Sequence, residues 1–307
     1  DHKRGEPGQG PLERSNQEPT TSDFLFGYRD SANLLGRRTG ELHMALGQPS
    51  EVAAFAPEAC SSSYVQSRVH AMQASATKAL TLLRRRLTVL SDTDQELAQA
   101  VLEQEPALLD RLGTLCSQPL SALRIRCHGD YHLGQVLYTG SDFVIIDFEG
   151  EPAKSLAERR TKCLPIVDLA GMVRSFHYAA HVALRTLPSR RSLPSTSPDL
   201  GPWIEQWYRN ARTAFLRGYR TTAGEAKFLP QSHQEFDLLL DVHVLDKAFY
   251  ELTYELNNRP DWVGLPLTGL LQPADTSLVT DDTDGGGTVA HKPVPSPAGQ
   301  AKDEVNQ

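Results

Sequence analysis

The chain has 307 residues, of which 39% are apolar and 22% are charged, so its composition is that of an ordinary globular protein. Its formal net charge of −7 argues against nucleic acid as a main partner, because binding a phosphate backbone requires a basic face. No apolar run is long enough to span a bilayer and the N-terminus lacks an apolar signal core, so we expect no membrane contact and a cytoplasmic location. The four scattered cysteines fit reduced thiols.

Two polar segments flank the part of the chain that can build a core. Residues 1–22 are rich in Gly, Pro, Glu and Gln and contain a single aliphatic side chain, Leu12. Residues 273–307 are similar in character. Segments with so little apolar surface do not fold alone, so we expect both to be disordered or linker-like. Residues 23–272 are therefore predicted to form the folded domain.

The first predicted helix covers residues 24–46, where apolar side chains recur at helical spacing. Gly36 and Gly40 lie on a neighbouring face and would let another helix approach closely. Glu41 and His43 belong to the same helix. We predict that both are exposed helix residues and that neither belongs to a site.

Five further helical regions follow from apolar periodicity and from end signals. Ser61–Ser63 offer an N-cap to a long helix that runs towards Leu90, and Ser232 caps the last long helix. Asp168 lies in the first turn of a buried-looking helix, where it either interacts with the helix dipole or holds the preceding loop. The predicted helices are residues 61–90, residues 92–115 with a bend or a new start near Pro106, residues 166–184, residues 203–222 and residues 233–258.

The middle of the chain contains the only convincing sheet signal. Residues 135–139 and 143–147 are two β-rich runs separated by a short Gly-Ser-Asp turn, which predicts a hairpin. A charged loop at residues 153–162 follows it. The hairpin would bring Asp130, in the irregular loop before it, towards Gln135 and Asp147 at one end of the small sheet.

This arrangement provides the groups needed for kinase-type phosphoryl transfer. In such enzymes one Asp accepts the proton of the substrate hydroxyl, while an amide and a second Asp hold Mg²⁺ against the phosphates of ATP. We assign these roles to Asp130 as the base and to Gln135 and Asp147 as Mg²⁺ ligands. Glu149 is either a further ligand or supporting group, or an exposed loop acid. His128 is predicted to brace the loop through hydrogen bonds.

The same residues resemble a known family. The sequence H-G-D-Y-H-L-G-Q-V-L at 128–137, followed by I-D-F-E-G-E-P at 146–152, closely resembles the maltokinases. These enzymes belong to the aminoglycoside-phosphotransferase-like kinases. The Gln at position 135 and the E-G-E-P tail point to the maltokinase branch, since the ordinary aminoglycoside kinases carry Asn in place of that Gln. Three further stretches are similar to that branch: residues 34–43, 167–180 and 254–262.

The resemblance implies an α+β, mainly helical fold: the C-terminal lobe of a protein-kinase-like enzyme with a small catalytic β-ribbon. It implies the reaction of ATP with maltose to give ADP and maltose 1-phosphate with Mg²⁺, in α-glucan and trehalose metabolism. Some members of the family are fused behind a trehalose synthase, which makes that enzyme an expected partner. Nothing before Asp23 can form the N-terminal lobe. We therefore expect this chain to be a C-terminal lobe cut from a longer protein, or a piece of a fusion.

The acceptor-binding residues are expected on the last long helix, which lies near the sugar pocket in a maltokinase-like lobe. Lys247 and Tyr250 are three residues apart on one face of that helix, and Tyr254 comes next in line. They are predicted to bind the sugar, although a surface Lys and part-buried Tyr side chains would give the same pattern. His132 is a further candidate, near the metal site or purely structural.

Three alternatives remain open. The first is another small-molecule kinase of the same superfamily, with an aminoglycoside, choline or another sugar as acceptor. An acidic pocket wall without sugar-binding aromatics would favour a cationic acceptor. The second is a non-catalytic interaction module made of a truncated kinase lobe. The third and weakest is a metal-dependent hydrolase, because no second His/Asp cluster follows the H-G-D-Y-H motif.

Overall fold

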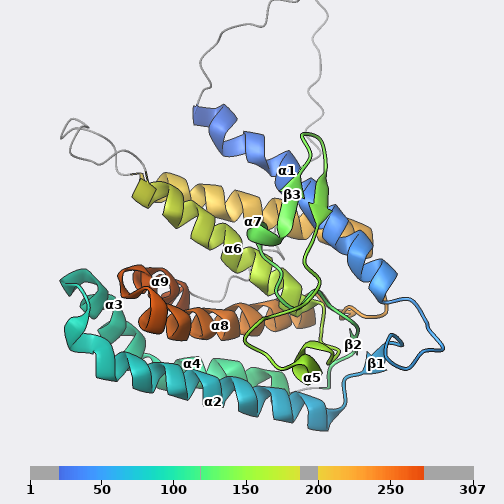
Figure 1. Ribbon diagram of the computed structural model, residues 1–307, viewed down its shortest axis with the longest axis horizontal. Helices are drawn as coiled ribbons and strands as arrows, with labels where there is room; N and C mark the ends of the chain where they lie inside the picture. The colour runs from blue at the N-terminus through green and yellow to red at the C-terminus, as the bar shows by residue number, and fades with distance from the viewer. Residues whose placement is uncertain (1–20, 118, 187–199, 273–307) are drawn as a thin grey trace, which may run out of the picture. The chain divides into compact units, whose positions relative to one another are not determined.

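The computed structural model describes residues 21–117, 119–186 and 200–272, and the tails predicted at 1–22 and 273–307 lie outside this part, apart from Thr21 and Ser22. The described part is mainly helical with short two-stranded sheets, which confirms the predicted fold class (Figure 1). Its α-helices are α1 (Thr21–Leu46), α2 (Ser62–Arg86), α3 (Asp92–Glu103), α4 (Glu105–Gly113), α5 (Leu156–Arg159), α6 (Ile166–Thr186), α7 (Gly201–Ala223), α8 (His233–Asn258) and α9 (Gly264–Leu271).

The strands form two antiparallel pairs. The predicted hairpin is present as β3 (Val136–Tyr138) and β4 (Phe143–Ile145). Gly140 turns the chain between them with a backbone φ of 96°, a value that residues other than Gly rarely adopt. The second pair joins β1 (Glu58–Ala59) to β2 (Leu123–Arg124). The alternation at 124–127 indicated a strand end there, but the pairing was not predicted, because a two-residue strand such as β1 is too short to show an alternating pattern.

The helix boundaries follow local chemistry. The hydroxyl of Ser61 accepts a hydrogen bond from the backbone N–H of Tyr64 at 3.2 Å, which caps α2, and Ser232 caps α8 in the same way. The region predicted as one helix at 92–115 is divided into α3 and α4, and Pro106 lies in the first turn of α4. Gln104 has a non-helical backbone between the two, so the alternative of a new start near Pro106 is correct.

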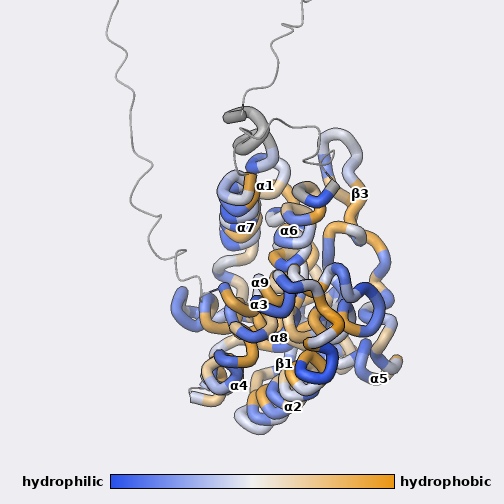
Figure 2. Tube along the Cα trace, turned by 90° about the vertical axis from the view of Figure 1, so that its left-hand side faces the viewer, coloured by the Kyte–Doolittle hydropathy of each residue, from blue (hydrophilic) through white to orange (hydrophobic). Residues whose placement is uncertain are grey.

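The segment predicted as a charged loop at 153–162 contains one short helix, α5. Its N-terminus is a capping box, in which Ser155 and Glu158 each bond the backbone N–H of the other. The segment around α5 is coloured hydrophilic in Figure 2, in keeping with its run of charged residues. The exposed charges keep this stretch at the surface.

The core is built by helices that pack in succession. α1 packs along α7, α6 packs against both α7 and α8, and α8 also contacts α2 and α9 (Figure 1). Fully buried side chains of α6, α7 and α8, such as Phe176, Phe215 and Phe249, fill the space between these helices. None of the described helices is long and apolar enough to cross a membrane.

Two glycines allow the close contact between α1 and α7. A Cβ atom on Gly36 would lie 2.0 Å from the backbone oxygen of Phe215, and one on Gly218 would lie 2.0 Å from the backbone oxygen of Asn33. Backbone atoms cannot move aside as a flexible side chain can. The close packing expected for Gly36 is therefore confirmed, and a reciprocal Gly on α7 completes it.

We expect Gly36→Ala to lower the free energy of unfolding by about 1–3 kcal/mol, because α1 and α7 must separate to admit the methyl group. The matched control is Gly113→Ala on α4, where an added Cβ meets only the side-chain amide of Gln73, at 3.3 Å. Since Ala favours helix more than Gly does, that variant should be neutral or slightly stabilised. Urea unfolding followed by circular dichroism measures both, and equal stabilities of the two variants would contradict the prediction.

Candidate active site

The loop before the hairpin, which contains His128, Gly129 and Asp130, is held in place by Asp168 at the start of α6. Its two carboxylate oxygens accept hydrogen bonds from the backbone N–H groups of His128 at 2.7 Å and of Gly129 at 2.9 Å. Burial alone raises the pKa of this carboxyl, but the hydrogen bond and charge of His43, together with the two N–H groups, bring the pKa below its usual value. Of the two roles considered for Asp168, holding the loop is the one that the contacts support.

His43 is the partner of Asp168 on α1. Its Nε2 lies 3.1 Å from Asp168 Oδ2, and its Nδ1 lies 2.9 Å from the hydroxyl of Tyr219 on α7. The prediction that His43 is exposed was wrong, because α7 covers this face of α1 and leaves the side chain fully buried. Glu41 is exposed as predicted and pairs with Arg38. These buried hydrogen bonds connect the loop, through Asp168 and His43, to helices α1 and α7.

The rest of the loop is fixed by α6 and by the end of β4. A Cβ atom on Gly171 would lie 2.5 Å from the backbone oxygen of Tyr131, so α6 touches the loop directly. His128 is 1% exposed, and its Nε2 lies 2.8 Å from the backbone oxygen of Ile146 just beyond β4. These contacts are the ones that a bracing role of His128 requires. Asp130 therefore stands on a loop with little freedom to move.

Asp130 lies beside a second carboxylate, that of Glu151. Burial and the negative charge of Glu151 raise the pKa of Asp130, while Lys247 and His132 oppose the shift. The side chain of Asp130 is 16% exposed, and His132 Nε2 lies 4.0 Å from its Oδ2. A carboxylate with raised proton affinity at the wall of a cavity is suited to accept a proton from a substrate hydroxyl.

The two predicted metal ligands meet at the end of the hairpin. Gln135 Nε2 donates a hydrogen bond to Asp147 Oδ2 at 2.7 Å. Asp147 has a φ of 63°, a strained conformation for a residue with a side chain, and such strain concentrates at functional sites. Both groups offer oxygen ligands near the surface, and Mg²⁺ needs only one or two protein ligands because it keeps water. The pair therefore fits Mg²⁺.

Glu149 is exposed two residues further along, and among the described residues it makes no hydrogen bond to Gln135 or Asp147. Within the described ranges, no three His, Cys, Asp or Glu side chains come together in a way that would hold a metal. A transition-metal site of the zinc-hydrolase type is thus not formed by this part of the chain. The assignment of Gln135, Asp147 and Glu149 to Mg²⁺ stays a prediction.

A cavity of about 640 Å³ opens beside Asp130, between α6, α8 and the loop after the hairpin. The predicted acceptor residues His132, Lys247, Tyr250 and Tyr254 all line it. Its volume is in the range of small-molecule sites. The structure therefore brings together the predicted base and the acceptor candidates, with the predicted metal ligands on the hairpin that follows the loop.

The charged side chains of this cavity are mostly paired. Glu151 accepts a hydrogen bond from the hydroxyl of Tyr250 at 2.9 Å, and its other oxygen lies 3.9 Å from Lys247 Nζ. Glu251 is paired with the fully buried Arg174 at 2.6 Å. Paired in this way, the carboxylates keep fixed orientations and can still accept hydrogen bonds from a ligand.

The sequence reasoning missed three acids of the cavity wall, which are Glu151, Glu251 and Glu255. Two signals were present in the sequence. Glu251 and Glu255 follow Lys247 at intervals of four, so they lie on the same helix face. Glu151 is the second acid of the E-G-E-P motif, which was used for the resemblance but given no role. Tyr178 on α6 also lines the cavity, and its hydroxyl donates to Glu255 at 3.1 Å.

Comparison with known proteins places this geometry in context. Residues 21–229 match the model of the phosphotransferase enzyme family. The glucosamine kinase of Mycolicibacterium smegmatis is 28% identical over 242 residues, which are 77% of this chain and 52% of that protein. The glucosamine kinase of Streptacidiphilus jiangxiensis is 30% identical over 170 residues, 52% of this chain and 34% of that protein. The chain thus spans about half or less of the length of the curated relatives it matches.

Solved structures show the same fold. A glucosamine kinase in complex with glucosamine, ADP and inorganic phosphate matches with a TM-score of 0.64 and 22% identity, over 80% of this chain and 52% of that one. A second crystal form of glucosamine kinase gives a TM-score of 0.63, also at 22% identity, over 83% of this chain and 54% of that one. At this level of identity the likeness concerns the fold.

Proposed function

The chain belongs to the phosphotransferase enzyme family, and from this premise we propose that it carries the acceptor site and most of the Mg²⁺ site of an ATP-dependent sugar kinase. One observation carries the proposal: Asp130, held rigidly by Asp168, stands at the wall of a cavity lined by polar and aromatic side chains. Sugar recognition uses this combination, with planar polar groups for the hydroxyls and flat faces for the C–H surfaces.

In the proposed reaction Asp130 orients the acceptor hydroxyl and accepts its proton as the oxygen attacks the terminal phosphate of ATP in line. Gln135 and Asp147 would hold Mg²⁺ on the nucleotide side of the ribbon. When bound there, the ion neutralises charge on the phosphate oxygens. Lys247 and Tyr250 keep Glu151 in place beside the base, so the acceptor meets a fixed set of hydrogen-bonding groups.

For the acceptor we propose an amino sugar such as glucosamine, with maltose as the second candidate. The lining of the cavity holds four acids, including Asp130 and Glu151, but only two bases, Lys247 and Arg259, and this acidic excess favours a cationic acceptor. It also contains Tyr178, Tyr250 and Tyr254, so a sugar ring is favoured over choline or another small amine. The names of the matched relatives support the amino sugar, whereas maltose rests on the motif resemblance, as does the association with trehalose synthase.

The test is ATP- and Mg²⁺-dependent phosphorylation of glucosamine, maltose and glucose by the full-length protein, followed by ADP release and mass spectrometry of the sugar. We expect glucosamine to be phosphorylated with the highest kcat/KM. Asp147→Asn should lower kcat at least tenfold, while Asp110→Asn, an exposed acid on α4, serves as the control. Preference for maltose would restore the maltokinase assignment, and transfer to no acceptor by the folded protein would leave a non-catalytic interaction module.

A further inference from the structure

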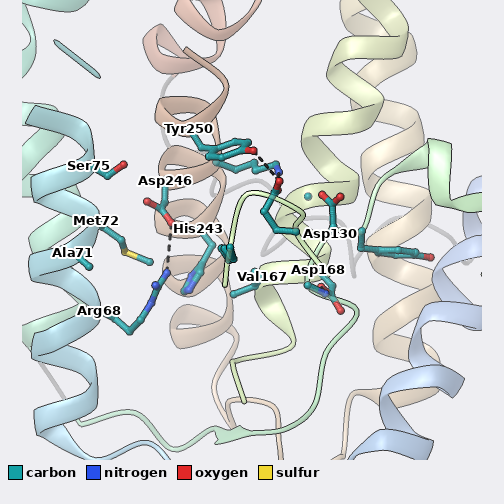
Figure 3. Close-up of a pocket in the computed structure, with 16 residues that line it drawn as sticks. Arg68, Ala71, Met72, Ser75, Asp130, Val167, Asp168, His243, Asp246 and Tyr250 are labelled. Carbon is teal, nitrogen blue, oxygen red and sulfur yellow. Dashed lines mark hydrogen bonds and ion pairs between the residues drawn. The ribbon is translucent and has the colours of Figure 1, made fainter. Parts of the chain in front are cut away.

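A second, smaller cavity lies on the other side of the residues that flank Asp130. It measures about 220 Å³ and is bounded by α2, α8 and the catalytic loop. Asp130, Glu151, Lys247 and Tyr250 line both cavities, so these four side chains form a common wall. In Figure 3 the helix with Arg68 and Ser75 faces the helix with His243 and Asp246 across this space. The two cavities therefore adjoin at the reacting group.

The groups in the smaller cavity differ from those of the larger one in how they are paired. Glu251 and Glu255 in the larger cavity each have an Arg partner at 2.6 Å. Asp246 has only Arg68, at 3.6 Å across the cavity, beyond ordinary hydrogen-bond distance. Among the contacts within the described residues, no donor comes closer to the carboxylate of Asp246. Asp246 and Arg68 thus present an acceptor and a donor that a ligand can satisfy.

The remaining surface of the smaller cavity limits what the ligand can be. Met72 and Val167 supply apolar surface, and Ser75 adds a hydroxyl. The volume is below the range of a complete ligand site, so the cavity suits one part of a ligand that extends from the larger cavity. A carboxylate facing a guanidinium matches neighbouring hydroxyl groups, which both donate and accept, better than it matches a phosphate, because Asp246 would repel an anion.

We propose that the smaller cavity is a second acceptor subsite, in which Asp246 and Arg68 bind the hydroxyls of an uncharged ring attached to the phosphorylated sugar. This inference rests on the proposed function and extends it. It assigns the α2–α8 side of Asp130 to the acceptor and makes Arg68 and Asp246 determinants of acceptor length. A two-ring glycoside would place its reacting hydroxyl at Asp130 and its second ring between α2 and α8.

The test compares one-ring sugars with two-ring sugars whose second ring is uncharged: glucose with maltose, and glucosamine with a disaccharide in which an uncharged glucose is linked to glucosamine. Binding is measured by calorimetry and transfer by ADP release, for wild type, Asp246→Asn and Arg68→Gln. Each variant should weaken binding of the preferred two-ring sugar about tenfold, as expected for a lost charge-assisted hydrogen bond, and leave its one-ring counterpart unchanged. Asp110→Asn on α4 is the matched control, and thermal unfolding confirms that each variant is folded.

The outcomes separate the inference from the proposed function. If two-ring binding depends on Asp246 and Arg68 but no sugar is phosphorylated, the subsite stands and the kinase assignment falls. If sugars are phosphorylated and the variants change one-ring and two-ring acceptors equally, or change neither, the kinase stands and the subsite is refuted. If no sugar of either length binds or reacts, both are overturned.

Discussion

Replacing Asp130 by asparagine should lower kcat about 10³-fold while leaving the fold intact. The amide keeps the shape of the side chain but cannot accept the proton of the acceptor hydroxyl, and removal of a general base costs 10²–10⁴ in rate. The loop itself is held by Asp168 and His128, which this change does not touch. Phosphorylation of the preferred sugar by the full-length protein measures the effect, with Asp110→Asn as the control. A residual rate within tenfold of wild type would exclude Asp130 as the base.

The same substitution should stabilise the protein at neutral pH. Because burial and the charge of Glu151 raise the pKa of Asp130, the folded state binds the proton more tightly than the unfolded state does. At neutral pH the ionised carboxylate therefore costs stability; this cost shrinks as the pH falls through the raised folded pKa and is gone below the unfolded pKa. Urea unfolding of wild type and variant at neutral and acid pH checks the sign: the gain should shrink in acid.

The raised pKa also predicts the acid limb of the pH–rate profile. Activity should fall as Asp130 becomes protonated, at a pH above that expected for an ordinary Asp. Replacing Glu151 by glutamine removes the neighbouring negative charge, so the acid limb should move to lower pH. A profile of kcat/KM against pH for wild type and Glu151→Gln tests this, and an unchanged limb would mean that Glu151 does not act on the base.

Replacing Asp168 by alanine should lower the free energy of unfolding by about 3–5 kcal/mol and abolish transfer by the molecules that remain folded. The substitution breaks a fully buried pair with His43 and leaves the N–H groups of His128 and Gly129 without an acceptor. The loop that carries Asp130 would then lose its anchor. Urea unfolding measures the stability, and hydrogen exchange of the two loop amides measures the loss of the anchor.

The pH dependence supplies an internal check on this prediction. Because the folded pKa of Asp168 lies below the usual value of 3.8, its stabilisation is present at neutral pH and is lost as the pH falls through the folded pKa. The difference between wild type and Asp168→Ala should therefore narrow in acid. A matched variant, Glu41→Gln, removes an exposed acid from α1 and should change neither stability nor loop exchange. Protected loop amides in Asp168→Ala would show that other contacts suffice.

Much of the architecture was readable from local patterns. Helical periodicity located the long helices, Ser61 and Ser232 marked two helix starts, and the Gly-Ser-Asp turn between two β-rich runs located the hairpin. The hairpin in turn placed Gln135 beside Asp147, since both lie at the open end of one ribbon. These features depend on residues close together in the sequence, for which backbone propensity and spacing carry the information.

Contacts between distant segments were harder to predict. His43 was expected to be exposed because its helix shows an ordinary polar face, and only the approach of α7 and the loop buries it against Asp168 and Tyr219. Arg68 and Asp246 are 178 positions apart in the chain and carry no shared signal that one sequence can show. Their pairing follows from how α2 packs on α8.

The sequence alone supplied the chemical groups of the proposed site: a candidate base in a loop, an amide and an acid on a ribbon, and a helix with Lys and Tyr side chains as acceptor candidates. The tertiary structure decided their environment. It buried Asp130 next to Glu151, which together raise the pKa of the proposed base, and it opened one cavity on each side of that pair. Reactive groups are encoded by residue identity, whereas burial, pairing and cavity shape arise from the packing of segments that are far apart in the chain.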